Sequence, residues 1–179
     1  MYYFMAYRYG MVLILFWATT TFGQIHIRDH APESKSFVID SMFFPVDGVL
    51  ISGHGWRNGR IHHGLDISHN NRDTIFAAWN GFVRYINHGY TGGYGNLVIL
   101  RHWSDLETYY AHAREILVDD HQFVRKGQPI AIVGSTGNSL GTHLHFEVRY
   151  KGLSIDPAAI RNKQRFTIIK NGQVYELED

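Results

Sequence analysis

The most informative stretch of the sequence is Gly141-Thr-His-Leu-His-Phe-Glu-Val148. In a β-strand, alternate side chains point to opposite faces, so His143 and His145 share one face of this segment. Leu144 and Phe146 share the other face and can enter an apolar core. The alternation therefore predicts a half-buried strand. Two imidazoles on one face are typical of a metal or acid–base site, although surface strands also carry polar residues without any such role.

Segments of similar character lie on both sides of this strand. They are short, rich in β-branched and aromatic residues, and separated by turns that contain glycine or asparagine, which is the pattern of an antiparallel sheet. We therefore expect an all-β, mainly antiparallel fold. A single helical turn is expected over residues 156–161, where Asp156 can cap it and Pro157 can open it. The expected strands cover residues 48–52, 74–78, 81–86, 96–101, 107–111, 128–133 and 143–149.

The composition fits one globular domain and excludes several classes of protein. The chain has 179 residues, of which 45% are hydrophobic and 18% charged, so it can form a packed core. The net charge of +1 lacks the basic excess of nucleic-acid-binding domains, so we expect no nucleic-acid partner. Cysteine is absent from the sequence, which excludes a disulfide scaffold, a Cys-ligated zinc finger, a thiol nucleophile and a lipid-modified cysteine.

Residues 1–23 have the character of a secretory signal peptide. Arg8 supplies a positive charge, residues 11–17 form a short apolar run, and small or polar residues follow up to Gly23. The apolar run is shorter than the roughly 20 residues of a membrane-spanning helix, but a short uncleaved anchor remains the alternative. We therefore expect an exported protein, periplasmic or extracellular, with no stable membrane association after cleavage.

The rest of the chain divides into three parts. Residues 24–44 are mixed and polar and are interpreted as an N-terminal arm, with one strand over residues 36–39. Residues 45–160 form the expected β-sheet domain. Residues 161–179 are expected to form a C-terminal β-hairpin, because Asn171-Gly172 lies between two β-prone runs and is a strong hairpin signal.

A second group of candidate ligands lies in Arg60-Ile-His-His-Gly-Leu-Asp66. If this segment is extended, His62, Gly64 and Asp66 share a face, His63 points the other way, and the glycine keeps space open beside a metal. Zinc accepts imidazole nitrogen and carboxylate oxygen, and a catalytic zinc site uses three protein ligands. One histidine of the 143/145 pair would complete the set, whereas an exposed turn with incidental histidines is the alternative.

A third group, Tyr109-Tyr-Ala-His112, lies on another expected strand. Alternation places Tyr110 and His112 on the same face, and this motif is weak by itself. A histidine near an activated water can accept its proton. A second histidine, or a tyrosine such as Tyr110, can stabilise the oxyanion of a tetrahedral intermediate.

The three groups together resemble the lysostaphin-type (LytM-domain) zinc endopeptidases, which cut peptide cross-links of bacterial peptidoglycan. The order His62-x-Gly64-x-Asp66, Tyr110-x-His112, His143-Leu-His145 carries the resemblance, which extends from about residue 45 to residue 160. Each motif alone is weak and the ordered set is specific. The surrounding sequence also matches at Ser52-Gly-His-Gly-Trp-Arg57, Ala78-Trp-Asn-Gly81, Gly93-Tyr-Gly95, Lys126-Gly-Gln-Pro129, Gly134-Ser-Thr-Gly137 and Asp156-Pro157.

The resemblance implies a fold, a cofactor and a division of roles. The fold would be a compact β-sheet domain of the duplicated hybrid motif type with an open groove. His62, Asp66 and His145 would hold Zn²⁺, and His112 and His143 would be the catalytic histidines. The substrate would be a peptidoglycan peptide with small, glycine-like or D-amino-acid residues.

Two other functions are compatible with a resemblance of this kind. Some members of the family have lost metal ligands and act as binding proteins that activate a cell-wall amidase. All five expected site residues are present here, which favours the hydrolase. A histidine-rich metal-binding protein without catalysis would carry exposed, unordered histidines, which disagrees with their alternation on expected strands.

Overall fold

The computed structural model describes residues 24–29, 37–40, 42–57, 59–68, 73–89, 93–161, 166–170 and 173–178. The chain forms two compact units, Met42–Asn162 and a second unit made of Met1–Ser41 with Lys163–Asp179. The expected signal peptide and the Asn171-Gly172 turn lie outside the described residues. No helix in the described part of the chain is long and apolar enough to cross a membrane.

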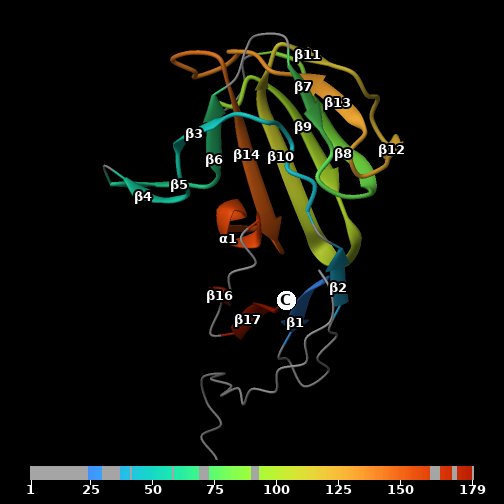
Figure 1. Cartoon of the computed structure of the whole chain (residues 1–179), viewed down its shortest axis with the longest axis vertical. Helices are drawn as coiled ribbons and strands as arrows, with labels where there is room; N and C mark the ends of the chain where they lie inside the picture. The colour runs from blue at the N-terminus through green and yellow to red at the C-terminus, as the bar shows by residue number, and fades with distance from the viewer. Residues whose placement is uncertain are drawn as a thin grey trace, which may run out of the picture. The chain divides into compact units, whose positions relative to one another are not determined.

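The larger unit is built on one antiparallel sheet of eight strands, which confirms the expected all-β fold. Strands β10 (Leu106–Ala113) and β14 (His143–Tyr150) lie side by side at its centre (Figure 1). Strand β15 (Leu153–Ile155) pairs with β14 off the main path. The remaining strands are β12 (Phe123–Val124), β8 (Gly81–Asn87) and β9 (Asn96–Arg101) beyond β10, and β6 (Leu65–Ser68) and β3 (Val49–Ser52) beyond β14.

Smaller elements complete this unit. Strands β11 (Glu115–Ile116), β13 (Pro129–Ile132) and β7 (Thr74–Phe76) form a second, three-stranded sheet. The hairpin of β4 (Gly55–Arg57) and β5 (Arg60–His62) extends away from the main sheet (Figure 1). A 3₁₀ turn covers Trp103–Asp105, and helix α1 covers Pro157–Arg161. Asp156 Oδ1 accepts a hydrogen bond from Ala158 N at 2.9 Å, as expected of an N-cap.

The alternation along β14 produces the core of the larger unit. Leu144, Phe146 and Val148 are fully buried on one face of the strand. The ring of Tyr110 packs against that of Phe146 with a centroid separation of 5.4 Å. Burying a side chain of this size stabilises the fold by about 2 kcal/mol, so this layer fixes the register of β14 against β10.

The smaller unit is a four-stranded antiparallel sheet. Its order is β16 (Phe166–Lys170), β17 (Gln173–Glu178), β1 (Gln24–Asp29) and β2 (Phe37–Asp40). β2 lies where one strand of the N-terminal arm was expected, and β16 pairs with β17 in antiparallel register. The pairing of β1 with β17 joins the two ends of the chain, and no local sequence pattern predicts it.

Candidate metal centre

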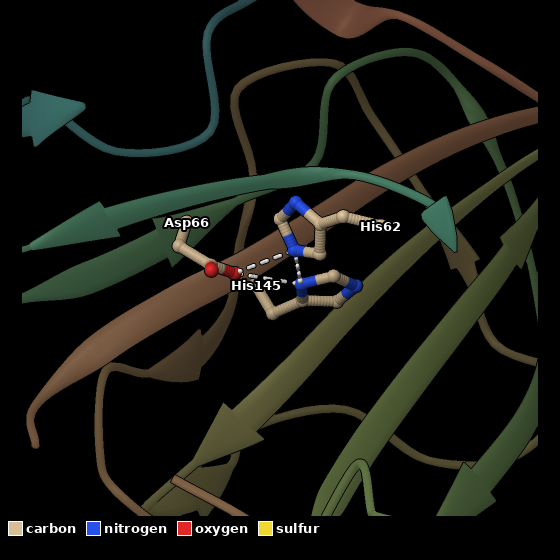
Figure 2. Close-up of side chains that lie close together, drawn as sticks. All are labelled: His62, Asp66 and His145. Atoms are coloured by element: carbon tan, nitrogen blue, oxygen red, sulfur yellow. Dashed lines mark hydrogen bonds and ion pairs between the residues drawn. The ribbon is translucent and has the colours of Figure 1, made fainter. Parts of the chain in front are cut away.

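Three side chains from three strands meet beside the centre of the large sheet. Asp66 on β6 and His145 on β14 are directly opposite each other in the antiparallel pairing, and His62 ends β5. Asp66 Oδ1 lies 2.8 Å from His145 Nδ1 and 3.1 Å from His62 Nε2. The two imidazole nitrogens are 3.1 Å apart. Figure 2 shows the three side chains pointing toward one another.

The tautomers of the two histidines fit a bound cation. His62 Nδ1 donates a hydrogen bond to the Gly53 carbonyl at 2.7 Å, and His145 Nε2 donates to Glu147 Oε1 at 2.9 Å. A neutral imidazole carries one proton, so the nitrogens that face Asp66 present lone pairs. Two lone pairs and one carboxylate oxygen therefore converge on one point. This donor set suits Zn²⁺, which accepts both imidazole nitrogen and carboxylate oxygen.

The electrostatics of this cluster also favour a cation. Burial lowers the pKa of His145, but its hydrogen bonds to Asp66 and Glu147 outweigh burial and raise it overall. Burial raises the pKa of Asp66, but the neighbouring histidines hold that pKa at about 2. The site thus attracts a positive charge, and a metal would compete with a proton for the same position.

Glu147 fixes the orientation of the His145 imidazole through a hydrogen bond. The Glu147 side chain is fully buried, and it accepts hydrogen bonds from Tyr94 Oη at 2.7 Å and from Arg149 Nε at 2.6 Å. Burial raises the pKa of Glu147, but the bonds from His145 and Arg149 bring it to about 2, so the group is a carboxylate. Arg149 Nη2 also donates to Tyr94 Oη at 3.0 Å, which closes the network. A ligand held this way is fixed in both orientation and tautomer.

Two further histidines flank the cluster. His143 Nε2 lies 3.8 Å from Asp66 Oδ1, and the rings of His143 and His112 are 4.7 Å apart between centroids. His143 Nδ1 donates to the Gly141 carbonyl at 2.9 Å, and His112 Nδ1 donates to the Thr136 carbonyl at 2.8 Å. Burial lowers the pKa of His112 to about 4, so this imidazole is neutral at pH 7 and can accept a proton.

All five side chains expected to form the site line one pocket of about 790 Å³. The pocket is open to solvent along one side of the sheet, and the β4–β5 hairpin and the segment before β14 border it. The pocket is lined by His62, Asp66, His112, His143 and His145, together with Tyr94, Glu147, Arg57, Arg60 and neighbouring apolar residues.

His112 reaches the pocket because β10 contains a bulge. The pairing of β10 with β9 shifts register between Tyr110 and Ala113, and His112 has a positive φ of 62°. The His112 N–H donates to the Tyr94 carbonyl at 2.9 Å, outside the ladder. A bulge re-aims a side chain relative to simple alternation, so His112 and Tyr110 no longer share a face.

The expected position of Tyr110 in the site is therefore wrong. Tyr110 is fully buried on the core face opposite the pocket, where it lies across the β10–β14 pair from Phe146. Its hydroxyl accepts a hydrogen bond from Ala78 N at 2.9 Å and lies 2.9 Å from Thr108 Oγ1. A tyrosine held in this way cannot contact a substrate in the pocket.

The segment from His62 to Asp66 is not one continuous strand. β5 ends at His62 and β6 begins at Leu65, so the chain bends between them. His63 is directed away from the cluster, with Nδ1 3.0 Å from Ser154 Oγ. A Cβ atom on Gly64 would lie 2.3 Å from the Phe146 carbonyl oxygen. The glycine thus permits close packing against β14, and the expectation that it keeps space beside a metal is wrong.

Two residues of the site were not expected from the sequence. Glu147 shares the alternation of His143 and His145, so the pattern of β14 could have identified it. Tyr94 lies in a loop between glycines, and nothing in its local sequence indicates that its hydroxyl reaches a buried carboxylate.

Comparison with known proteins now identifies the family. Residues 60–157 match peptidase family M23, so the chain belongs to that family. Its fold resembles a zinc-containing peptidase from Vibrio cholerae, with a TM-score of 0.61 and 28% identity over 72% of this chain and 44% of that one. It also resembles the catalytic domain of lysostaphin from Staphylococcus simulans, with a TM-score of 0.55 and 27% identity over 62% of this chain and 90% of that domain. These likenesses confirm the lysostaphin-like fold.

Curated relatives carry a different description. The chain is 42% identical over 124 residues to the "Murein hydrolase activator NlpD" of Salmonella dublin, a match that covers 69% of this chain and 32% of that protein. It is 46% identical over 92 residues to the "Lipoprotein NlpD" of Yersinia enterocolitica, covering 51% of this chain and 93% of that sequence. The match thus spans about a third of the length of the first of these relatives.

Proposed function

We propose that this chain is a zinc-dependent endopeptidase that hydrolyses peptide cross-links or stem peptides of bacterial peptidoglycan. The observation that carries the proposal is the complete set of His62, Asp66 and His145, with His112 and His143 beside it in one pocket. An activator that only binds a partner has no chemical need for converging lone pairs flanked by two further imidazoles. Membership of peptidase family M23 supports the same class of reaction.

The side chains divide into metal ligands and proton carriers. His62 Nε2, Asp66 Oδ1 and His145 Nδ1 would hold Zn²⁺. The ion, when bound, supplies an activated water and polarises the scissile carbonyl. His112 has its Nδ1 proton committed to the Thr136 carbonyl, so its Nε2 can accept the proton that the attacking water loses.

His143 can serve the second half of the reaction. It stands 4.7 Å from the His112 ring between centroids, with its Nδ1 committed to the Gly141 carbonyl. The Nε2–H that His112 gains from the water can protonate the leaving amine, which returns His112 to its starting form and balances the proton taken from the water. His143 can stabilise the developing oxyanion when its Nε2 carries a proton.

The alternative function is activation of a cell-wall amidase by a protein that does not hydrolyse peptides itself. The names of the relatives favour this alternative over the endopeptidase, because relatives at 41–42% identity are called murein hydrolase activators. The side chains of this chain favour the endopeptidase. The family resemblance implies that activators of this kind have lost metal ligands, whereas here the described residues retain all three.

The relatives also bear on location. Several are named lipoproteins or outer-membrane antigens, which supports export to the cell envelope. They do not support the expectation that the exported protein lacks stable membrane association. We propose that this chain acts in the envelope, where peptidoglycan is found.

Digestion of purified peptidoglycan separates the two functions. Six samples are compared: the zinc-loaded protein, the same protein in chelator and a His145→Ala variant, each with and without an added cell-wall amidase. An endopeptidase alone releases peptide fragments with new amino termini, and chelator or His145→Ala abolishes the release. An activator alone releases nothing, but increases the amidase product even as the His145→Ala variant, and that result would remove the endopeptidase proposal.

A further inference from the structure

Two arginines face each other on the hairpin that borders the pocket. Arg57 on β4 and Arg60 on β5 are directly opposite in the antiparallel register, and both line the pocket that contains the His62, Asp66 and His145 cluster. Like charges directly opposite each other destabilise a strand pair. This hairpin forms a two-stranded sheet of its own, so it has little other pairing to offset the repulsion.

The two guanidinium groups differ in their partners. Arg57 donates hydrogen bonds to Ser52 Oγ and, at 3.4 Å, to Asp66 Oδ2, so it is positioned next to the candidate metal ligand. Arg60 is exposed and makes no ion pair with any residue that the structure describes. Arg60 lines the pocket, and its guanidinium group donates no hydrogen bond to another described residue.

The charge of the pocket lining points to a negative ligand. Among its described lining residues the carboxylates are Asp66 and Glu147. Asp66 belongs to the metal cluster, and Glu147 is fully buried and paired with Arg149. Arg57 pairs with Asp66 Oδ2 at 3.4 Å, so Arg60 is the rim cation that has no carboxylate partner among the described residues, and a bound divalent metal would make the pocket more positive. Such a field concentrates anionic ligands.

The rim also has an apolar component that suits a peptide. Ile51 and Ile61 line the pocket on the hairpin side, and Leu140 lines it on the opposite side with its side chain fully exposed. Apolar contacts with a few placed polar groups are typical of ligand pockets. A small apolar residue could lie between these side chains while a carboxylate beside it meets the arginines.

We propose that Arg57 and Arg60 form a carboxylate-binding subsite, so that the ligand of this pocket is a peptide with a free carboxylate close to the scissile amide. The position of this carboxylate next to the amide that is cut rests on the proposed function. Binding of the carboxylate can be measured independently of hydrolysis. Arginine suits this task because its planar fork binds a carboxylate through two parallel hydrogen bonds.

The test uses a matched pair of small ligands with the zinc-loaded full chain. N-acetyl-D-alanyl-D-alanine carries a free carboxylate, and its carboxamide differs only in that group. Dissociation constants are measured by calorimetric titration, and hydrolysis of each ligand is scored separately by mass spectrometry. We expect the acid to bind about tenfold tighter than the amide at low salt, since a hydrogen bond to a charged group contributes about that factor.

Variants show whether the preference for the acid over the amide depends on the arginines or on the metal. Arg60→Gln should reduce the acid-over-amide preference at least severalfold, and Arg60→Lys should retain part of it, because the charge remains but the fork is lost. Arg125→Gln removes an exposed arginine that does not line the pocket and should leave the preference unchanged. Zinc content is measured in every variant, so that metal loss is not mistaken for loss of the subsite.

The outcomes separate this inference from the proposed function. A parent protein with no acid preference, whether both ligands bind equally or neither binds, overturns the subsite. A preference that survives Arg60→Gln also overturns it, because the carboxylate would then be held by the metal. A preference without hydrolysis of either dipeptide retains the subsite, and the endopeptidase proposal is then decided by the digestion of peptidoglycan. Equal hydrolysis of both ligands retains the endopeptidase and removes the subsite.

Discussion

Strands β14 and β10 lie next to each other at the centre of the sheet, yet they deliver their functional side chains in different ways. β14 is regular: it pairs in unbroken register with β10 and β6, and its alternate residues His143, His145 and Glu147 face the pocket side. β10 is interrupted by a bulge at His112, where the backbone adopts a φ of 62°. Alternation therefore locates a site on the first strand and misplaces Tyr110 on the second.

Alternation predicts the direction of side chains correctly only where a strand pairs without a bulge. A bulge adds one residue to one strand of a pair and leaves the other strand unchanged. Its cause here lies in long-range packing, because the His112 N–H and carbonyl bond to Tyr94 and Thr136 in two separate loops. The sequence around His112 gives no sign of these partners.

Removal of a ligand from the regular strand should have the largest effect. We expect His145→Ala to lose tight zinc binding, from about one ion per chain to nearly none, because one of three donors is removed. His63→Ala is the matched control, since His63 lines the same pocket but is directed toward Ser154. Metal analysis of both purified, folded variants measures the effect. Loss of zinc from the His63 variant alone would overturn the choice of ligands.

The two flanking histidines test whether the bulge produces a catalytic residue. His143→Ala on β14 and His112→Ala on β10 should each keep zinc and lower turnover by about 10²–10⁴-fold, the usual contribution of a general acid or base. Turnover on a defined peptide and zinc content are measured side by side. If only the β14 variant loses activity, the bulge places His112 in the pocket without giving it a role in the reaction.

Substitution of Glu147, on the same face of β14, should have a smaller effect on zinc binding. Glu147→Gln should weaken zinc affinity by about 10–100-fold, because the carboxylate that fixes the His145 tautomer is lost. Glu107→Gln is the control on β10, where Glu107 forms ion pairs with Arg84 and Arg101 at another place on the sheet. Competition with a chelator of known affinity gives the values. Equal zinc affinity in the Glu147 variant and the parent would mean that His145 needs no such support.

Tyr110 should show the smallest functional effect and a clear structural one. Tyr110→Phe leaves the Ala78 N–H without its acceptor in the core and removes one of the two partners of the Thr108 hydroxyl, which should destabilise the fold by about 1–3 kcal/mol. Zinc content and turnover should stay at the parent values. Denaturant unfolding and activity assays distinguish the two roles, since a large loss of turnover at unchanged stability would return Tyr110 to the pocket.

Much of this architecture could be predicted from the sequence. Period-two alternation and turn residues predicted the strands, although the central strands β10 and β14 are largely buried on both faces. Alternation alone left open which histidine of the 143/145 pair joins His62 and Asp66. The family resemblance implied His145, and the structure brings these three side chains together. The use of His62 instead of His63 followed the expected choice, although the chain bends at Gly64 and the assumed continuous strand does not exist.

The remaining features depend on contacts between distant segments. The bulge at His112, the loop that carries Tyr94, and the close approach of Gly64 to β14 each need partners more than ten residues away. The pairing of β1 with β17 joins the two ends of the chain. No local period encodes such contacts, so these features could be found only in the folded structure.

Hydrolysis of a defined cross-linked muropeptide in water labelled with oxygen-18 shows whether this chain is itself an endopeptidase. We expect the zinc-loaded protein alone to cut one peptide bond and to place the label in the new carboxylate. Chelator or His145→Ala should abolish both the cleavage and the labelling. Recovery of the intact, unlabelled muropeptide after prolonged incubation with protein shown to contain zinc would contradict the endopeptidase proposal and favour an activator.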